Sequence, residues 1–217
     1  MKNAIGLKDI FLRKHLSAPT INFLKKTPIK AEQITAIRIT LEVISALMLS
    51  IGAYYYSLTA MIIFQFASFM DSVDGAIARH RKCYSKNWVI VDGVFHHIVS
   101  PLLLLCLGIG MFRSTNRAIF LYAGFVGAFA QTLSQVIQAD LSYFRKHRDT
   151  KVERAKKGGI INNTYLLFWD FIRLEQPLSI LFFAVVFNVP AFALLFYCLF
   201  NLLRLTMKII EVIKLPK

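Results

Sequence analysis

The chain has 217 residues, of which 56% are hydrophobic, and its mean hydropathy is +0.54. A soluble domain of this length is rarely so apolar, and several segments approach the roughly 20 apolar residues that a membrane-spanning helix needs. The formal net charge is +14. Because the basic residues gather between apolar segments, this charge indicates a positive cytoplasmic face rather than nucleic-acid binding. We therefore expect an all-α, polytopic membrane protein.

The N-terminal 30 residues alternate apolar side chains, such as Leu7, Ile10 and Phe11, with lysines and arginines. This pattern predicts an amphipathic helix that lies in the membrane interface on anionic lipid. The alternative is a solvated basic segment without a membrane role. The sequence is thus divided into an interfacial segment, a transmembrane domain and a basic cytoplasmic tail, which are residues 1–32, 33–210 and 211–217.

Apolar segments separated by turns or basic stretches predict six spans, with both termini in the cytoplasm. We expect them at about residues 33–54, 58–79, 88–112, 118–140, 164–187 and 190–207. In the first span, Arg38 and Glu42 lie one turn apart and are expected to pair. In the fourth, Ala123, Gly127 and Ala130 form a stripe suited to close helix packing.

Two basic stretches, residues 79–86 and 142–163, predict loops on the cytoplasmic side. The short connections near residues 52–57 and 113–117 are expected on the other side. Arg113 and Arg117 are exceptions to the charge rule there, but the cytoplasmic stretches outweigh them.

Acidic residues within or beside apolar helices mark a candidate site, because a charge at mid-bilayer costs about 2.5–3.5 kcal/mol on insertion scales. Asp71 and Asp74 are three residues apart, and Asp92 and His96 are four apart, so each pair shares a helix face. The short connection between the second and third spans folds them antiparallel. We therefore expect three carboxylates and an imidazole to converge near the cytoplasmic surface.

Three clustered carboxylates repel one another, so we expect either raised pKa values or a bound cation. Hard oxygen ligands suit Mg²⁺, Mn²⁺ or Ca²⁺, and such ions often hold a phosphate-bearing substrate. Gly75 and Ala78 leave space on the same helix, and Arg79 offers a fork of donors that fits phosphate. The pattern therefore indicates a metal-dependent site for a phosphate compound.

The spacing resembles the signature of the CDP-alcohol phosphotransferase family, D-x2-D-G-x2-A-R-x8-G-x3-D-x3-D. The chain matches it at Asp71, Asp74, Gly75, Ala78, Arg79 and Asp92. Ser85 also stands where many members carry a serine. Two positions depart from the signature: Trp88 replaces its last glycine, and His96 replaces its fourth aspartate.

The resemblance implies transfer of a substituted phosphate from a CDP-alcohol to an acceptor alcohol, with release of CMP, in phospholipid or related phosphodiester synthesis. At least one substrate would be a lipid, and a homodimer is possible. The implied cofactor is Mg²⁺ or Mn²⁺, as one or two ions. The implied metal ligands are Asp71, Asp74, Asp92 and His96, and the implied nucleotide-site residues are Gly75, Ala78, Arg79 and Ser85.

The two departures leave several roles open. His96, with a reference pKa of about 6.5, would suit a general base at neutral pH, acting with Asp92. It could instead ligate metal or simply be buried in the pocket. Trp88 could close the nucleotide pocket, stack on a base that enters differently, or serve as an interfacial belt residue.

The segment LSYFRKHR after the fourth span contains an S-Y-x-R pattern similar to one in family members that use inositol phosphate. Ser142, Tyr143 and Arg145 are therefore candidates to bind an acceptor phosphate or an anionic headgroup. The alternative is a positive-inside loop without a ligand.

Two other functions remain open. A non-catalytic relative could bind lipid or nucleotide, because both departures fall in the expected site. An intramembrane prenyltransferase is the weaker alternative, since only the Asp71-x2-Asp74 pattern supports it. In each case we expect an integral membrane protein, in a bacterial inner membrane or an internal membrane, with its site facing the cytoplasm.

Overall fold

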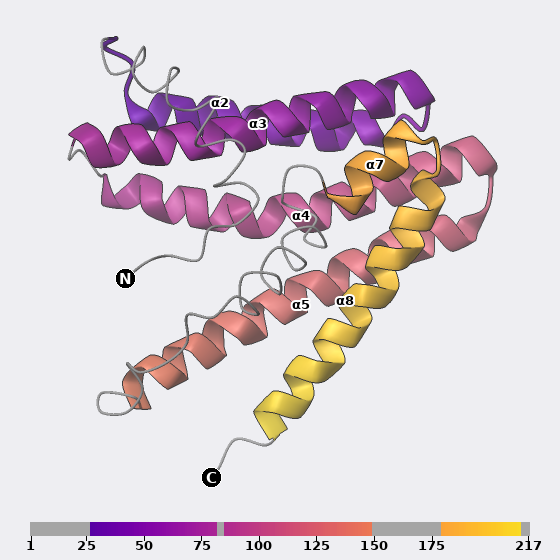
Figure 1. Ribbon diagram of the computed structural model, residues 1–217. Coiled ribbons are helices and arrows are strands. Elements are labelled where there is room, and N and C mark those ends of the chain that lie inside the picture. Colours follow the sequence, from indigo (N-terminus) through magenta and orange to yellow (C-terminus); the bar gives the residue numbers. More distant parts are fainter. Residues whose placement is uncertain (1–26, 82–84, 149–178, 214–217) are drawn as a thin grey trace, which may run out of the picture.

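A computed structural model describes residues 27–81, 85–148 and 179–213, and these residues are helical apart from short turns (Figure 1). The prediction of an all-α fold is confirmed for them. The helices are α2 (Ala31–Leu49), α3 (Tyr54–Arg81), α4 (Lys86–Thr115), α5 (Ala118–Arg148), α7 (Ile180–Val186) and α8 (Pro190–Ile213).

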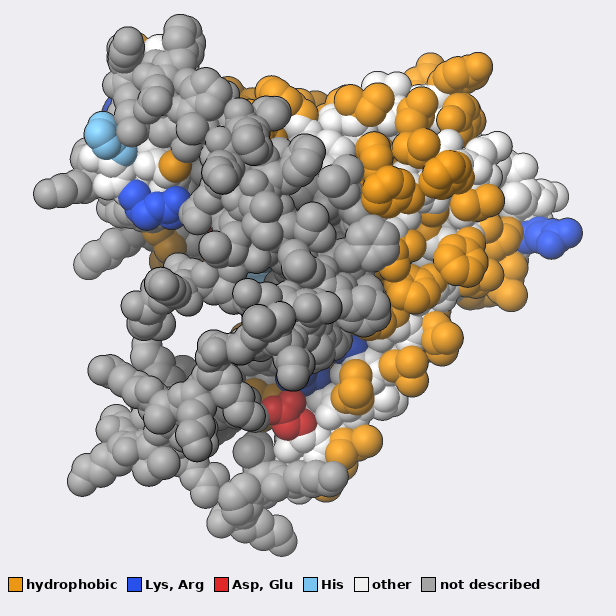
Figure 2. Space-filling model, viewed as in Figure 1, with side chains coloured by type: hydrophobic (Ala, Val, Ile, Leu, Met, Phe, Trp, Pro, Cys, Tyr) orange, Lys and Arg blue, Asp and Glu red, His pale blue; other side chains and the backbone are white. Residues whose placement is uncertain are grey.

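Four helices are long and apolar enough to cross a membrane, over Tyr54–His80, Asn87–Thr115, Ala118–Leu141 and Pro190–Ile213. Many large hydrophobic side chains on them are exposed, and Figure 2 shows such side chains gathered over the right-hand part of the molecule. Exposed apolar surface of this extent suits contact with lipid. These helices make the chain an integral membrane protein.

The other predicted membrane segments are not among these four helices. The first corresponds to α2, which has 19 residues, carries Glu32, Arg38 and Glu42, and falls outside the apolar set. Of the predicted fifth span, the described part is helical only over α7. The N-terminal interfacial helix lies outside the described residues and stays a prediction.

The helices α2, α3 and α4 run side by side, and α5 and α8 lie at an angle to them (Figure 1). The contact between α2 and α3 includes a hydrogen bond within the bundle, in which the Ser45 hydroxyl donates to the Ala60 carbonyl at 2.6 Å. Both residues are fully buried. Because α2 contacts both α3 and α4, the same three helices surround the predicted acidic site.

Small residues allow the remaining helices to approach closely. A Cβ atom added to Gly108 of α4 would lie 2.8 Å from the Cα atom of Gly124 on α5. The predicted stripe on α5 is confirmed as a packing surface: a Cβ atom added to Gly127 would lie 3.2 Å from the Cα atom of Cys198 on α8, and Ala123 and Ala130 are buried. Because the hydrophobic effect does not drive helices together within lipid, close contacts between small residues provide much of the packing between spans.

Two predicted basic loops are wrong in their extent. Helix α3 continues to Arg81, and α5 continues to Arg148, so Ser142, Tyr143 and Arg145 lie on a helix rather than in a loop. The physical reason is that the apolar part of a helix ends at the membrane surface, whereas its backbone hydrogen bonds can continue through polar residues beyond it. Arginine and lysine are good helix formers, and residues 142–148 contain no glycine or proline.

Candidate active site

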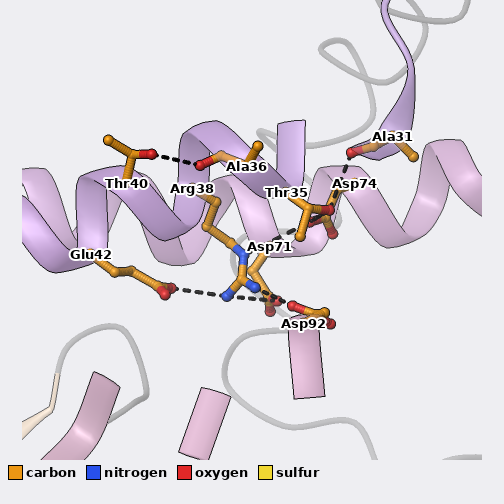
Figure 3. A network of polar contacts seen from close by, with 9 residues as sticks. All are labelled: Ala31, Thr35, Ala36, Arg38, Thr40, Glu42, Asp71, Asp74 and Asp92. Atoms are coloured by element: carbon orange, nitrogen blue, oxygen red, sulfur yellow. Dashed lines mark hydrogen bonds and ion pairs between the residues drawn. The ribbon is translucent and has the colours of Figure 1, made fainter. Parts of the chain in front are cut away.

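The three aspartates that match the signature converge, as the sequence predicts. Asp71 and Asp74 come from α3 and Asp92 from α4, and all three surround one side chain of α2, that of Arg38 (Figure 3). The convergence follows from the packing of α2, which contacts both α3 and α4 and extends Arg38 between their carboxylates.

Arg38 lies at the centre of this group, and its side chain is 2% exposed. Its Nη1 atom donates to Glu42 Oε1 at 3.0 Å and lies 3.6 Å from Asp71 Oδ1. Its Nε atom lies 3.8 Å from Asp74 Oδ2, and its Nη2 atom donates to Asp92 Oδ1. The predicted Arg38–Glu42 pair is confirmed, and it forms part of a larger network.

Helix α2 also supplies a neutral donor to the site. The Thr35 hydroxyl donates to Asp74 Oδ2 at 2.8 Å, and Asp74 is 8% exposed (Figure 3). Sequence reasoning did not assign Thr35, Arg38 or Glu42 to the site. A signal was present, because an arginine and a glutamate within an apolar helix are costly unless they have a structural or functional role.

A cavity of about 160 Å³ lies beside the carboxylates. Its lining includes Asp74 and Asp92 together with three residues predicted for the nucleotide site, Gly75, Ala78 and Ser85. Trp88 also lines it, on the first turn of α4. The small residues on α3 leave this space open, and the indole bounds it from α4.

The family model for CDP-alcohol phosphatidyltransferase matches residues 29–212. The chain belongs to this family. The protein is therefore an enzyme of the CDP-alcohol phosphatidyltransferase family, and this membership implies CDP-alcohol phosphotransferase activity. No curated protein matches the chain. The match begins just before α2 and ends one residue before the end of α8, so it covers the described helices almost completely.

In this transferase, Arg79 is the one predicted nucleotide-site residue that is absent from the described lining of the cavity. A Cβ atom added to Gly75 would lie 3.3 Å from Arg79 Nη1, so the guanidinium lies over the glycine one turn earlier. The absence of a side chain at Gly75 thus makes room for Arg79. Arg79 is exposed, which leaves its donors available at the edge of the cavity.

His96 lies one turn after Asp92 on α4 and is exposed, with its ring centroid 6.2 Å from that of His97. It is not among the described residues that line the cavity. His96 and Glu42 are close enough to interact electrostatically. The imidazole therefore lies at the margin of the carboxylate group rather than inside the cavity.

The family is generally metal-dependent, and the donor set fits a divalent cation in its chemistry. Asp71, Asp74 and Asp92 provide hard oxygen ligands from two helices, which Mg²⁺ and Mn²⁺ prefer. Within the part of the chain that the structure describes, no three acidic, histidine or cysteine side chains are arranged as a metal site. The guanidinium of Arg38 lies where the carboxylates meet.

Proposed function

We propose that the enzyme transfers a substituted phosphate from a CDP-alcohol to an acceptor alcohol and releases CMP, with Mg²⁺ or Mn²⁺ as cofactor. At least one substrate is a lipid, since the site lies at the end of membrane-embedded helices. The observation that carries this proposal is the convergence of Asp71, Asp74 and Asp92 beside a cavity lined by Gly75 and Ala78.

Each part of the site has a role in this reaction. Asp71, Asp74 and Asp92 would hold the cation, which when bound neutralises charge on the diphosphate and on the leaving CMP. Gly75, Ala78 and Ser85 would border the nucleotide, and Arg79 would donate to a phosphate oxygen from the edge of the cavity. These residues orient the donor for in-line attack by the acceptor hydroxyl.

His96 would accept the proton of the acceptor alcohol. It is exposed and lies one turn from Asp92, so an acceptor held beside the cation could reach it. Ser142, Tyr143 and Arg145, on the last turns of α5, would bind an acceptor phosphate or an anionic headgroup.

The charge distribution supports a site that faces the cytoplasm. The end of α3 and the start of α4 meet at the site and carry Arg79, Arg81 and Lys86 within a few residues. The opposite end of α4 and the turn that leads to α5 carry Arg113 and Arg117 as their basic residues. Cytoplasmic connections are usually the more basic ones.

A second candidate is a relative that binds nucleotide or lipid without catalysing transfer. It is favoured by Trp88, whose bulky side chain lines the cavity of about 160 Å³ at the position where the signature has glycine. Trp88 limits its size. If the indole merely blocks the donor, Trp88→Gly should strengthen binding of a CDP-alcohol and create or raise CMP release. If the indole stacks on the base, the same change should weaken binding.

The direct test of the proposed function is CMP release by the purified protein with a panel of CDP-alcohols and acceptor alcohols. We expect release with Mg²⁺ or Mn²⁺ and none with EDTA. A thermal shift with a cytidine nucleotide plus metal should accompany it. Binding of a CDP-alcohol without release for any acceptor would favour the second candidate.

A further inference from the structure

The buried position of Arg38 requires an explanation that the family signature does not provide. The signature begins at Asp71, whereas Arg38 and Glu42 come from a different helix, α2. Their side chains are 2% and 8% exposed. Two buried charges in one apolar bundle are costly to maintain for packing alone.

One guanidinium does not neutralise the group that surrounds it. With Glu42, Asp71, Asp74 and Asp92 all ionised, the network keeps a formal charge of −3. The guanidinium remains charged in any protein environment, so its contribution is fixed. The excess negative charge therefore still favours an additional cation.

The contacts of Arg38 are also incomplete. Its Nε atom is buried and has no hydrogen-bond partner, and Asp71 and Asp74 lie beyond hydrogen-bond distance at 3.6 and 3.8 Å. Arg38 donates directly to Glu42 and Asp92. Its longer contacts with Asp71 and Asp74 lack the short, paired bonds that a guanidinium usually forms with carboxylate, so another ion can replace them.

Access to the network differs between its two sides. Arg38 reaches in from the buried side, whereas the side chains of Asp92 and Asp71 are 47% and 30% exposed. A cation from solvent would thus approach these carboxylates from the side opposite to the guanidinium. Glu42, on the same helix as Arg38 and one turn away, can keep its 3.0 Å contact while the aspartates turn to the cation.

We propose that Arg38 is a tethered counter-cation: it holds Asp71, Asp74 and Asp92 together in the metal-free protein and is displaced from them when the divalent cation binds. Glu42 is the partner that retains the displaced guanidinium. Arg38 is a positioning residue in this scheme, and it competes with the metal. The inference rests on the proposed function, because it requires the aspartates to be metal ligands.

The test is Mn²⁺ binding to the full-length protein in detergent, followed by the electron paramagnetic resonance signal of free Mn²⁺. We expect Arg38→Gln to bind Mn²⁺ about ten-fold more tightly than the wild type, because a positive charge a few ångströms from the ion is removed. The same variant should melt at a lower temperature in EDTA and gain more from added Mn²⁺ than the wild type does.

Arg113→Gln is the matched control. Arg113 is at the opposite end of α4, where its Nη1 atom donates to the Ser50 carbonyl at 3.0 Å. This variant should bind Mn²⁺ like the wild type. If Arg38→Gln does not fold, Arg38→Lys replaces it, and tighter Mn²⁺ binding is again expected because a single ammonium cannot contact all the carboxylates.

The outcomes separate this inference from the proposed function. If the wild-type protein binds no Mn²⁺, or if Asp71→Asn leaves its Mn²⁺ binding unchanged, both the inference and the proposed function are overturned. Wild-type binding together with equal or weaker binding by the folded Arg38 variant would overturn only the competition, and Arg38 would then serve to orient the carboxylates.

Discussion

Two of the polar regions inside the described helices differ in charge. Between α2, α3 and α4, one arginine lies among four carboxylates. Between α5 and α8, the Asn201 amide donates to Gln131 Oε1 at 3.2 Å and to the Gly127 carbonyl at 3.4 Å. The second region is neutral and consists of paired amides.

The difference separates a packing role from a ligand-binding role. A neutral amide pair between spans satisfies its own donors and acceptors and stabilises helix contact. A group with excess negative charge is costly unless another cation joins it, so its presence indicates a ligand. Substitutions in the charged region should therefore change catalysis, and substitutions in the neutral region should change stability.

The largest effect is expected for Asp74→Asn. Because partners of metal ligands already cost about 10–100-fold when removed, loss of a ligand should lower the rate of CMP release by more than about 100-fold. Thermal stability in EDTA should be maintained, since asparagine has the same shape and can still accept the Thr35 hydrogen bond of 2.8 Å. The comparison uses initial rates at saturating Mn²⁺ together with melting curves.

Asp140→Asn is the control for this change, because Asp140 is an exposed aspartate near the end of the apolar part of α5. Its activity should equal that of the wild type. Equal losses in the two variants would contradict the assignment of the charged region to metal binding.

Much of the charged region could be predicted from the sequence, because its three aspartates have helical spacing on helices joined by a short connection. The pairing of Arg38 with Glu42 could be predicted as well, but the contacts of Arg38 with the aspartates could not, since nothing in a local pattern indicates that α2 packs against both α3 and α4. The prediction of helix ends, such as the end of α5 at Arg148, was wrong for a related reason: hydropathy indicates where the membrane surface lies and not where the helix ends.

The next effect is expected at His96. If this residue is the general base, His96→Ala should lower kcat by about 100-fold or more and leave KM nearly unchanged, as expected for lost proton transfer. The affinity for Mn²⁺ should also be unchanged. Steady-state kinetics and Mn²⁺ binding measure the two quantities separately.

His97→Ala is the matched control for this change, because His97 is adjacent and also exposed. It should retain wild-type kinetics. A His96→Ala variant that binds Mn²⁺ more weakly would instead make His96 a metal ligand, and the charged region would then extend one turn further along α4.

The smallest effect is expected in the neutral region. Asn201 is 3% exposed, and Asn201→Leu should lower the free energy of unfolding by about 0.6 kcal/mol, the average for hydrogen bonds between membrane helices. The double variant Gln131→Leu/Asn201→Leu should lose less than the sum of the single changes, because neither amide is left without its partner. All three variants should retain CMP release at the wild-type rate. A large loss of activity in the folded double variant would mean that the contact between α5 and α8 also controls the site, and the division into packing and ligand-binding regions would fail.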